Sequence, residues 1–454
     1  MGVEAKHPQY TSAREAEWRL MRDAMSGESA IKAGGTIYLP KPSGFNSLPD
    51  NGTAAFAAYL FRAQFAEILA PTISAMVGIA HGTEIGIEFP AALEYLWEDC
   101  DGDGTPLEVM HRRITRELLT VGRFGMLADA PEGGGEPYLA GYAAERVINW
   151  DRAFFVLDES GKERTGFDWQ DVTRYRVLRL DGGRYVQEIY EGRTPAIAGS
   201  ASPVAMGGKP LDFVPFTVAS SVDLSPDIRT PPLVGVARAA LAIYQLSADY
   251  RHQLFWSGQE TLVAINGDAP EYVGSGVAHS MHGTETQTPD LKYVSPTCSG
   301  IDAHKAAIED NREAAVMAGA KLLEQSDSVQ ESGTARSLRF ESETTTLLSV
   351  LQSSCGLLEQ GLRGIAAMKG LNPEEVTVNA PPSLMDSAMT PADAQALVSI
   401  WQQGAISYQT LYENLRRGKI ASAERDADEE FRLRDAESVG EDEEEEITQP
   451  GNPA

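Results

Sequence analysis

Three aspartates in one short segment are the strongest candidates for metal chemistry in this sequence. Asp99, Asp101 and Asp103 are followed by Gly104, which matches the D-x-D-x-D-G opening of a calcium-binding EF-hand loop. Such a loop also needs a bidentate carboxylate at its twelfth position, and that position is Met110 here. The segment lacks this ligand, and a calcium-dependent binding protein built on the three aspartates stays an alternative hypothesis.

The residues that follow the aspartates predict the start of a helix. Thr105-Pro106-Leu107-Glu108 has the spacing of a capping box with proline at the first helical position. The preceding carboxylates would then lie at the positive end of the helix, where negative charge is stabilising. We expect this structural role for the segment.

Histidines and catalytic motifs give weaker signals. His279 and His282 could share a metal ion, but no cysteine or carboxylate lies near them at ligand spacing. The sequence has no P-loop, no G-x-G-x-x-G after a strand, no H-E-x-x-H and no G-x-S-x-G. A site assembled around Asp249 or His252 is the remaining enzyme hypothesis. We expect a non-enzyme with no metal and no cofactor.

The composition indicates an acidic, folded chain with several domains. A length of 454 residues predicts two to four domains, and 42% hydrophobic content is enough for a sizeable core. The formal net charge is −28, of which residues 424–454 contribute −10 and the rest of the chain −18. A DNA-wrapping protein would carry clustered positive charge, so this balance excludes a tight DNA binder.

The spacing of the cysteines and the length of the apolar segments indicate in which cellular compartment the protein is found. Cys100, Cys298 and Cys355 are too far apart for a zinc knuckle or a disulfide scaffold, which fits a reducing environment. The first ten residues contain no apolar signal region. The most apolar window, residues 65–80, is too short to span a bilayer. We therefore expect an intracellular protein without a membrane partner.

Helical periodicity dominates the first 130 or so residues. Ser12 and Glu15 form a capping box that predicts a helix ending at Gly27. A second amphipathic run starts at Thr53, and we expect it to break at Pro71.

The period changes to two between residues 136 and 221. The alternating runs on either side of Asp181-Gly182-Gly183 predict a β-hairpin. Residues 153–160 and 211–221 look like further strands, whereas the Gly-, Ala-, Ser- and Pro-rich stretch 194–210 predicts an exposed loop.

Two helices enclosing a small β element are predicted after Pro231-Pro232. The first covers about 25 residues, residues 258–300 contain two short strand candidates, and helical pattern resumes over 301–324. Apolar stripes on more than one side of the helices would be satisfied by identical subunits packed around an axis, or by a helical hairpin inside a monomer. Periodicity alone leaves both arrangements open.

A very long helix and a final helical pair complete the chain. The long helix is predicted over 334–369, with an apolar seam formed by Leu347, Leu351, Cys355, Leu358, Leu362 and Ile365. A strand candidate follows Pro373, and the last helical pair reaches Arg434.

Several stretches spread over most of the chain resemble one protein family. They include HPQY (7–10), LEYLWEDCDGDGTPLE (93–108), AERVINW (144–150), LDFVPFTVASSVDLSPD (211–227), SADYRHQLFWSGQETLV (247–263) and MTPADAQALVSIWQQGAISYQTLYENLRRG (389–418). In these stretches the chain resembles the portal, or head–tail connector, proteins of tailed bacteriophages, in a branch often described only as a domain of unknown function.

The resemblance implies a helix-rich α+β portal fold with wing, stem, clip and crown regions, long stem and wing helices, and a β-rich module in the wing. It implies a structural, non-enzymatic ring, dodecameric in assembled phages, at a capsid vertex of the virion. Double-stranded DNA would pass through this ring during packaging and ejection. The implied partners are the terminase large subunit, head–tail adaptor proteins, and major capsid and scaffold proteins, with assembly in the host cytoplasm.

The same resemblance implies a division of the chain into regions. These are a wing (1–230), a descending stem helix (231–257), a clip (258–300), a returning stem helix (301–324), a tunnel loop (325–333), a long wing helix with a return strand (334–384), a crown (385–435) and a disordered acidic tail (436–454).

The tunnel loop would face the DNA. The implied channel residues are Lys321, Gln325, Ser326, Asp327, Ser328, Val329, Gln330, Glu331 and Ser332. The loop itself has no lysine or arginine, which suits weak contact because each neutralised phosphate adds salt-dependent affinity. Lys321, Arg336 and Arg339 flank it and could form rings of positive charge or pair along their own helices. We favour pairing for Arg339, with Glu343 at i+4, and leave Lys321 open.

Overall fold

The computed structural model divides the chain into two compact units, Met1–Pro381 and Pro382–Ala454. The chain is 47% helical and 22% strand, which agrees with the expected α+β class. The structure describes residues 2–131, 134–192, 196–203, 205, 208–258, 260–268, 270–273, 280–284, 286–294, 300–319, 333–382, 384, 391–402, 405–417, 420–421 and 425–433.

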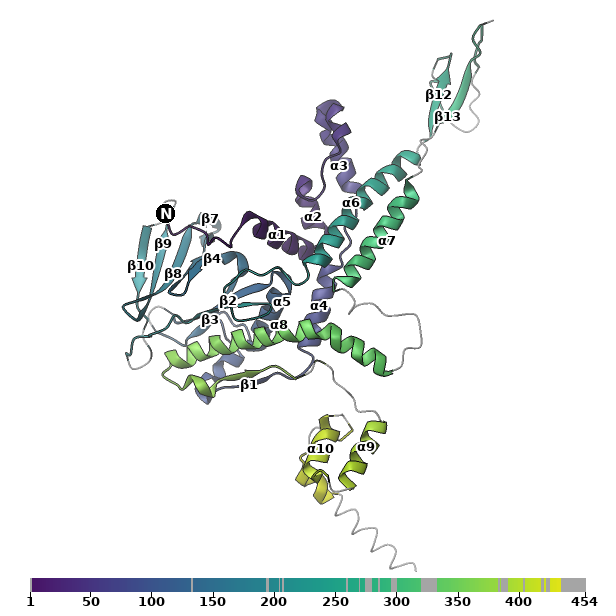
Figure 1. Ribbon diagram of the computed structural model, residues 1–454. Coiled ribbons are helices and arrows are strands. Elements are labelled where there is room, and N and C mark those ends of the chain that lie inside the picture. Colours follow the sequence, from purple (N-terminus) through teal and green to yellow (C-terminus); the bar gives the residue numbers. More distant parts are fainter. Residues whose placement is uncertain are drawn as a thin grey trace, which may run out of the picture. The chain divides into compact units, whose positions relative to one another are not determined.

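Helices open the first unit (Figure 1). They are α1 (Ser12–Ser26), α2 (Glu28–Ala33), α3 (Thr53–Arg62) and α4 (Leu69–Ala80). Thr11 caps α1, because its side chain accepts a hydrogen bond from the backbone N–H of Arg14 at 3.4 Å. The prediction of Ser12 as the cap was therefore wrong by one residue. Gly27 ends the helix as predicted, with a positive φ of 89°.

The predicted break in the second amphipathic run lies earlier than expected. α3 ends at Arg62, and Pro71 lies in the first turn of α4. A proline is tolerated there because the first N–H groups of a helix have no partner within the helix. Short 3-10 turns occur before α3, at Gly35–Ile37, Ser43–Ser47 and Pro49–Gly52, and between α4 and α5 (Leu107–Thr120), at Ala91–Trp97.

A three-stranded sheet forms the centre of the first unit. Its strand order is β11 (Phe216–Ser220), β2 (Arg123–Asp129) and β3 (Tyr138–Ala143), and every residue of β2 is buried. The long helix α8 (Gly333–Met368) packs on β2 and β11 and also contacts α5 (Leu107–Thr120). The predicted seam from Leu347 to Ile365 is buried, with at most 2% of each seam residue exposed.

Two glycines of α8 allow the helix to approach this sheet closely. A Cβ added at Gly364 would lie 2.8 Å from the Cβ of Ala128 on β2. A Cβ added at Gly361 would lie 2.6 Å from the sulfur of Met126. Both distances are below normal carbon contact, so these positions require glycine for packing.

A five-stranded sheet lies beside the first one. Its order is β10 (Ala196–Ala201), β9 (Arg184–Glu191), β8 (Arg174–Asp181), β5 (Phe154–Asp158) and β4 (Val147–Asp151). The predicted hairpin is β8–β9, in which Asp181 pairs with Arg184. Gly182 and Gly183 have φ values of 55° and 77°, as a type I′ turn requires.

One strand and one hairpin of this region were not predicted. β10 lies within residues 194–210, which were expected to form a loop, because its backbone pairs with β9 despite weak strand propensity. A separate hairpin, β6 (Gly161–Thr165) and β7 (Asp168–Val172), forms between β5 and β8.

A helical pair carries a distal hairpin, as the sequence predicted. α6 (Val234–Ser257) and α7 (Ile301–Met317) pack against each other, and β12 (Thr261–Ile265) and β13 (Asp290–Val294) form an antiparallel hairpin between them in the chain (Figure 1).

The remaining elements are short. β1 (Gly86–Glu88) pairs with β14 (Thr377–Asn379), which follows a 3-10 turn at Pro373–Glu375. The second unit contains the predicted final helical pair, α9 (Pro391–Gln402) and α10 (Tyr408–Arg417).

Candidate functional site

The aspartate segment folds onto its own backbone. Asp99 accepts a hydrogen bond from the N–H of Gly102 at 2.8 Å, and Asp101 accepts from the N–H groups of Asp103 and Thr105 at 3.0 and 3.1 Å. Burial alone would raise the pKa of Asp101, but hydrogen bonds from Thr105 and Asp103 outweigh it and lower the pKa. These carboxylates organise a turn.

The predicted capping box at Thr105–Glu108 is wrong, and the helix begins at Leu107, one residue later than expected. Pro106 occupies the N-cap position of α5 and gives no side-chain hydrogen bond. Among the described residues, no group of three histidine, cysteine or acidic side chains is placed to hold a metal ion.

Asp249 and His252, the residues of the enzyme hypothesis, fasten α3 to α6. The Tyr59 hydroxyl donates to Asp249 Oδ1 at 2.5 Å. The His252 ring meets the Tyr59 ring of α3 edge to face with centroids 5.5 Å apart, and His252 Nε2 accepts a hydrogen bond from Trp256 Nε1 of its own helix at 3.0 Å. Burial and then the Arg62 charge lower the pKa of His252. Both side chains are thus engaged in contacts between helices.

Most of the other predicted site residues are not described by the structure. His282 is exposed between β12 and β13. His279, Cys298, Lys321 and the tunnel-loop residues Gln325, Ser326, Asp327, Ser328, Val329, Gln330, Glu331 and Ser332 lie outside the described residues.

The burial of α6 decreases along the helix. The first half of α6 is buried, including Val236, Ile243 and Tyr244. Its last turn is not: the exposed fractions of Leu254, Phe255 and Trp256 are 40%, 39% and 54%. Large apolar side chains therefore reach the surface where the helix approaches the distal hairpin.

The distal hairpin carries apolar side chains on both faces. Because Leu262 pairs with Tyr293 and Ala264 pairs with Leu291, these four side chains share one face. The other face contains Val263, Ile265 and Val294 together with Lys292 and Asp290. Tyr293 is 58% exposed on the first face and Val294 is 51% exposed on the second.

α7 is acidic on balance. It contains four carboxylates, Asp302, Glu309, Asp310 and Glu313, against two cations, Lys305 and Arg312. Lys305 lies 3.9 Å from Asp302 and Arg312 lies 3.4 Å from Glu309, so each cation lies beside a carboxylate of its own helix.

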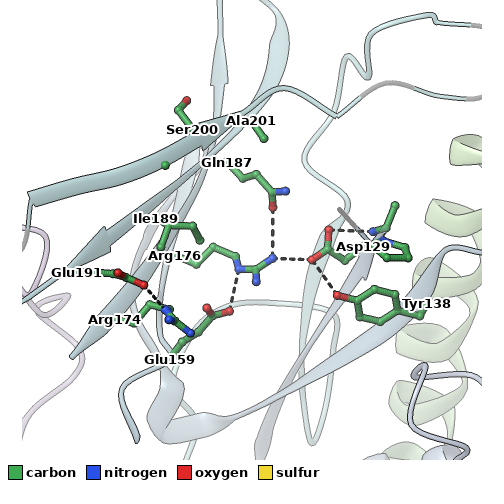
Figure 2. Close-up of a pocket in the computed structure, with 13 residues that line it drawn as sticks. Asp129, Tyr138, Glu159, Arg174, Arg176, Gln187, Ile189, Glu191, Ser200 and Ala201 are labelled. Atoms are coloured by element: carbon green, nitrogen blue, oxygen red, sulfur yellow. Dashed lines mark hydrogen bonds and ion pairs between the residues drawn. The ribbon is translucent and has the colours of Figure 1, made fainter. Parts of the chain in front are cut away.

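A polar hollow of about 470 Å³ lies between the two large sheets (Figure 2). Arg176 on β8 makes ion pairs with Asp129 on β2 at 2.5 Å and with Glu159 at 2.8 Å. Arg174 pairs with Glu191 at 2.6 Å. Burial alone would lower the pKa of Arg176, but Tyr142, Glu159 and Asp129 raise it. The charged groups around the hollow are paired with one another. The Arg176–Asp129 pair joins the two sheets, so we interpret these residues first as structural contacts.

Sequence reasoning missed a buried polar network at the junction of α4, α5 and α8. His81 Nε2 lies 2.9 Å from the Thr115 hydroxyl, which lies 2.8 Å from the Ser354 hydroxyl. His111 Nε2 lies 3.7 Å from the sulfur of Cys355. These residues are up to 274 positions apart, and no local spacing signals that they meet.

The network is uncharged at neutral pH. Burial, followed by the Arg112 charge, lowers the pKa of His81 to about 4. Burial, followed by His81, lowers the pKa of His111 to about 3. Burial raises the pKa of Cys355 to about 12, with Glu359 as the next cause. Neutral side chains suit a site that joins three helices in the core.

Comparisons with known proteins give one family match. Residues 232–368 match the family described as "Domain of unknown function (DUF4055)", a span that runs from α6 to the end of α8. No curated protein matches the sequence. Within the described residues, no helix is both long and apolar enough to cross a bilayer.

Among the solved structures that match this chain are chains of gene transfer agent (GTA) particles. A chain in the neck of the native particle computed with C12 symmetry has 15% identity and a TM-score of 0.41, covering 86% of this chain and 97% of that chain. A chain in the virion of the native particle has 15% identity and a TM-score of 0.43, with coverages of 86% and 98%. A chain in the neck of the empty particle computed with C6 symmetry has 14% identity and a TM-score of 0.41, with coverages of 87% and 99%.

Proposed function

We propose that this protein is a portal subunit: identical copies form a ring that conducts double-stranded DNA at a vertex of a virus-like capsid. The observation that carries the proposal is the distal hairpin β12–β13, which has apolar side chains on both faces. The hairpin indicates a ring, and the resemblance of the sequence to phage portal proteins indicates that the ring would be one that conducts DNA.

A lone two-stranded hairpin is at best marginally stable in water, because it needs a third strand or a packed helix to bury its apolar face. Among the described residues, β12 and β13 pair only with each other. A single dimer contact would cover one face. In a ring, each copy has two neighbours, and both faces of the hairpin can be covered.

The exposed end of α6 supports the same assembly. Leu254, Phe255 and Trp256 lie next to the hairpin in the chain and extend its apolar surface onto the helical pair. Contiguous exposed apolar surface of this kind is typical of a protein–protein interface. In this proposal α6 and α7 are the stem and β12–β13 is the clip.

The acidic balance of α7 supports a conducting channel. A helix whose cations are already paired presents net negative charge, which repels phosphate and prevents DNA from adhering. Residues 325–333 would form the tunnel loop in such a ring, with Lys321 beside it. The clip would meet the terminase large subunit and later the head–tail adaptors, and the wing would face capsid and scaffold proteins.

Oligomeric mass tests the proposal. The purified full-length protein is expected to form closed rings with a central channel, seen by negative-stain microscopy and mass photometry. Val263→Glu and Tyr293→Glu change opposite faces of the hairpin, and each is expected to abolish or strongly reduce ring formation. Val263→Glu places the new carboxylate opposite Lys292, so the hairpin itself stays favourable.

Trp169→Glu on the exposed strand β7, which places the new carboxylate opposite Arg164, is the matched control and is expected to leave rings intact. A wild-type protein that stays monomeric across micromolar concentrations and from low to high salt would overturn the proposal. Rings that persist in both hairpin variants would show that the hairpin is not the interface.

A further inference from the structure

The N-terminal arm, residues 2–9, lies against β4 of the five-stranded sheet (Figure 1). The N–H of His7 donates to the carbonyl of Ile148 on β4 at 2.9 Å. The His7 ring stacks on Trp150 of the same strand, with ring centroids 3.9 Å apart. His7 therefore joins the arm to the sheet through both its main chain and its side chain.

A third contact of His7 depends on its protonation state. The N–H of Gln9 donates to His7 Nδ1 at 3.2 Å, so this nitrogen carries a lone pair and no proton. The Gln9 side chain in turn binds a second segment, because its Nε2 donates to Asp227 Oδ1 at 2.9 Å and its Oε1 accepts from the N–H of Ile228 at 2.9 Å. A proton on Nδ1 would put two donors face to face and break the bond that positions Gln9.

The charges around His7 act on its protonation in both directions. Burial and then the guanidinium of Arg123 on β2 lower the pKa of His7, whereas Asp227 and Asp151 on β4 raise it. Both carboxylates already accept hydrogen bonds, and the net effect is a lowered pKa. Docking of the arm therefore favours neutral His7. It is strongest above the ordinary histidine pKa of about 6.5 and weakens as the pH falls below that value.

Beneath the arm lies a buried cation. Arg123 is fully buried, and its guanidinium lies 4.2 Å from the centroid of the Trp150 ring. Its Nη1 donates to the carbonyls of Ala144 and Val147 at 3.3 and 3.0 Å. Within the described part of the chain, Nε and Nη2 have no acceptor. A guanidinium buried without a carboxylate partner is costly, so access of solvent to this group would be favourable.

We propose that the N-terminal arm is an acid-sensitive strap: uptake of a proton at His7 Nδ1 releases residues 2–9 from β4 and gives solvent access to Trp150 and Arg123. Tyr10 is the hinge, because its buried side chain stays anchored by the hydrogen bond from its hydroxyl to the carbonyl of Glu145 at 2.9 Å. The contacts lie within one chain, so the strap does not depend on the proposed ring.

Hydrogen exchange of the full-length protein between pH 7.5 and 5.5 tests the proposal. Each rate is divided by that of an unstructured peptide at the same pH, which removes the direct effect of pH on exchange. Protection of the amides at positions 7 and 9 is expected to fall about fivefold with acid, the change in population that the loss of one hydrogen bond produces.

Two variants separate the roles of the His7 side chain. His7→Asn places an oxygen at the position of Nδ1, where it accepts the same N–H without titrating, so protection is expected to stay constant across the pH range. His7→Phe keeps a ring against Trp150 but has no acceptor, and its protection is expected to match that of the acidified wild type at every pH. His282→Asn, at an exposed histidine, is the control and should follow the wild type.

Constant protection of the arm in the wild type would overturn the proposal. An equal loss of protection in His7→Asn would also overturn it, since acid would then act elsewhere in the fold.

Discussion

At the residue scale, the buried histidines give the clearest link between structure and measurable behaviour. His81 and His111 are neutral in the folded protein because their burial disfavours the charged form. In an unfolded chain both would titrate near pH 6.5. The network therefore opposes proton uptake in the native state.

Acid is expected to destabilise the fold through this network. As the pH falls below about 6.5, the unfolded state binds protons that the folded state excludes, until the pH reaches the folded pKa of about 4 for His81 and about 3 for His111. Each group then removes about 1.4 kcal/mol of stability per pH unit within this window. His81→Gln retains a hydrogen-bonding side chain toward Thr115 and removes one titrating group.

Thermal unfolding between pH 7.5 and 5 measures this effect. The melting temperature of His81→Gln is expected to fall less steeply with acid than that of the wild type. His282→Gln, at an exposed histidine, is the control and should follow the wild-type curve. Identical slopes for all three proteins would contradict a titrating role for His81.

At the element scale, α8 was well predicted, because its apolar seam repeats at helical spacing over a long run. The periodicity did not predict which face of the sheet the helix covers or how closely it approaches. That distance is set at Gly361 and Gly364, where β2 leaves no room for a side chain.

Gly364→Ala is expected to destabilise the protein by about 1–3 kcal/mol, because the new Cβ would overlap Ala128. Gly356→Ala is the matched control in the same helix. Its Cβ would lie 3.3 Å from a methyl group of Leu224, a flexible and partly exposed side chain. Higher helix propensity should offset that contact. Urea unfolding compares the two, and equal stabilities would show that the close approach is not required.

β10 and the break between α3 and α4 show where local reasoning fails. The residues of β10 have weak strand propensity, and their pairing with β9 decides their conformation. The chain leaves the helical conformation after Arg62, well before Pro71. Pro71 itself lies in the first turn of α4, where a proline is tolerated. In both cases a neighbouring element or a position within an element outweighs residue type.

At the scale of the whole molecule, the charge balance and the helical pair belong together in the proposed ring. An acidic protein can handle DNA if the DNA is passed through a channel without being held. The wild-type ring is therefore expected to show no measurable binding to double-stranded DNA at about 0.15 M salt.

Reversal of charge on α7 tests this view. The double variant Glu309→Lys and Glu313→Lys also frees Arg312 from its partner, and it is expected to bind DNA with an affinity that falls steeply with salt. Glu163→Lys with Asp171→Lys makes the same charge change on the β6–β7 hairpin. Filter binding or fluorescence anisotropy compares the variants, and equal binding by both doubles would show that α7 does not face the DNA.

The sequence by itself determined the kinds and order of most elements, although not β10 or the β6–β7 hairpin. The alternation around Gly182 and Gly183, the helix–hairpin–helix after Pro231 and the seam of α8 are all local patterns, each set by the face that one element must bury. Only the tertiary structure decided which of these faces are covered. It joined His81, His111 and Cys355 in one network, bound the N-terminal arm to β4 through His7, and paired β12 and β13 only with each other among the described residues. The reason is physical: periodicity records that a face is apolar, whereas its partner is chosen by packing between segments that are distant in the chain.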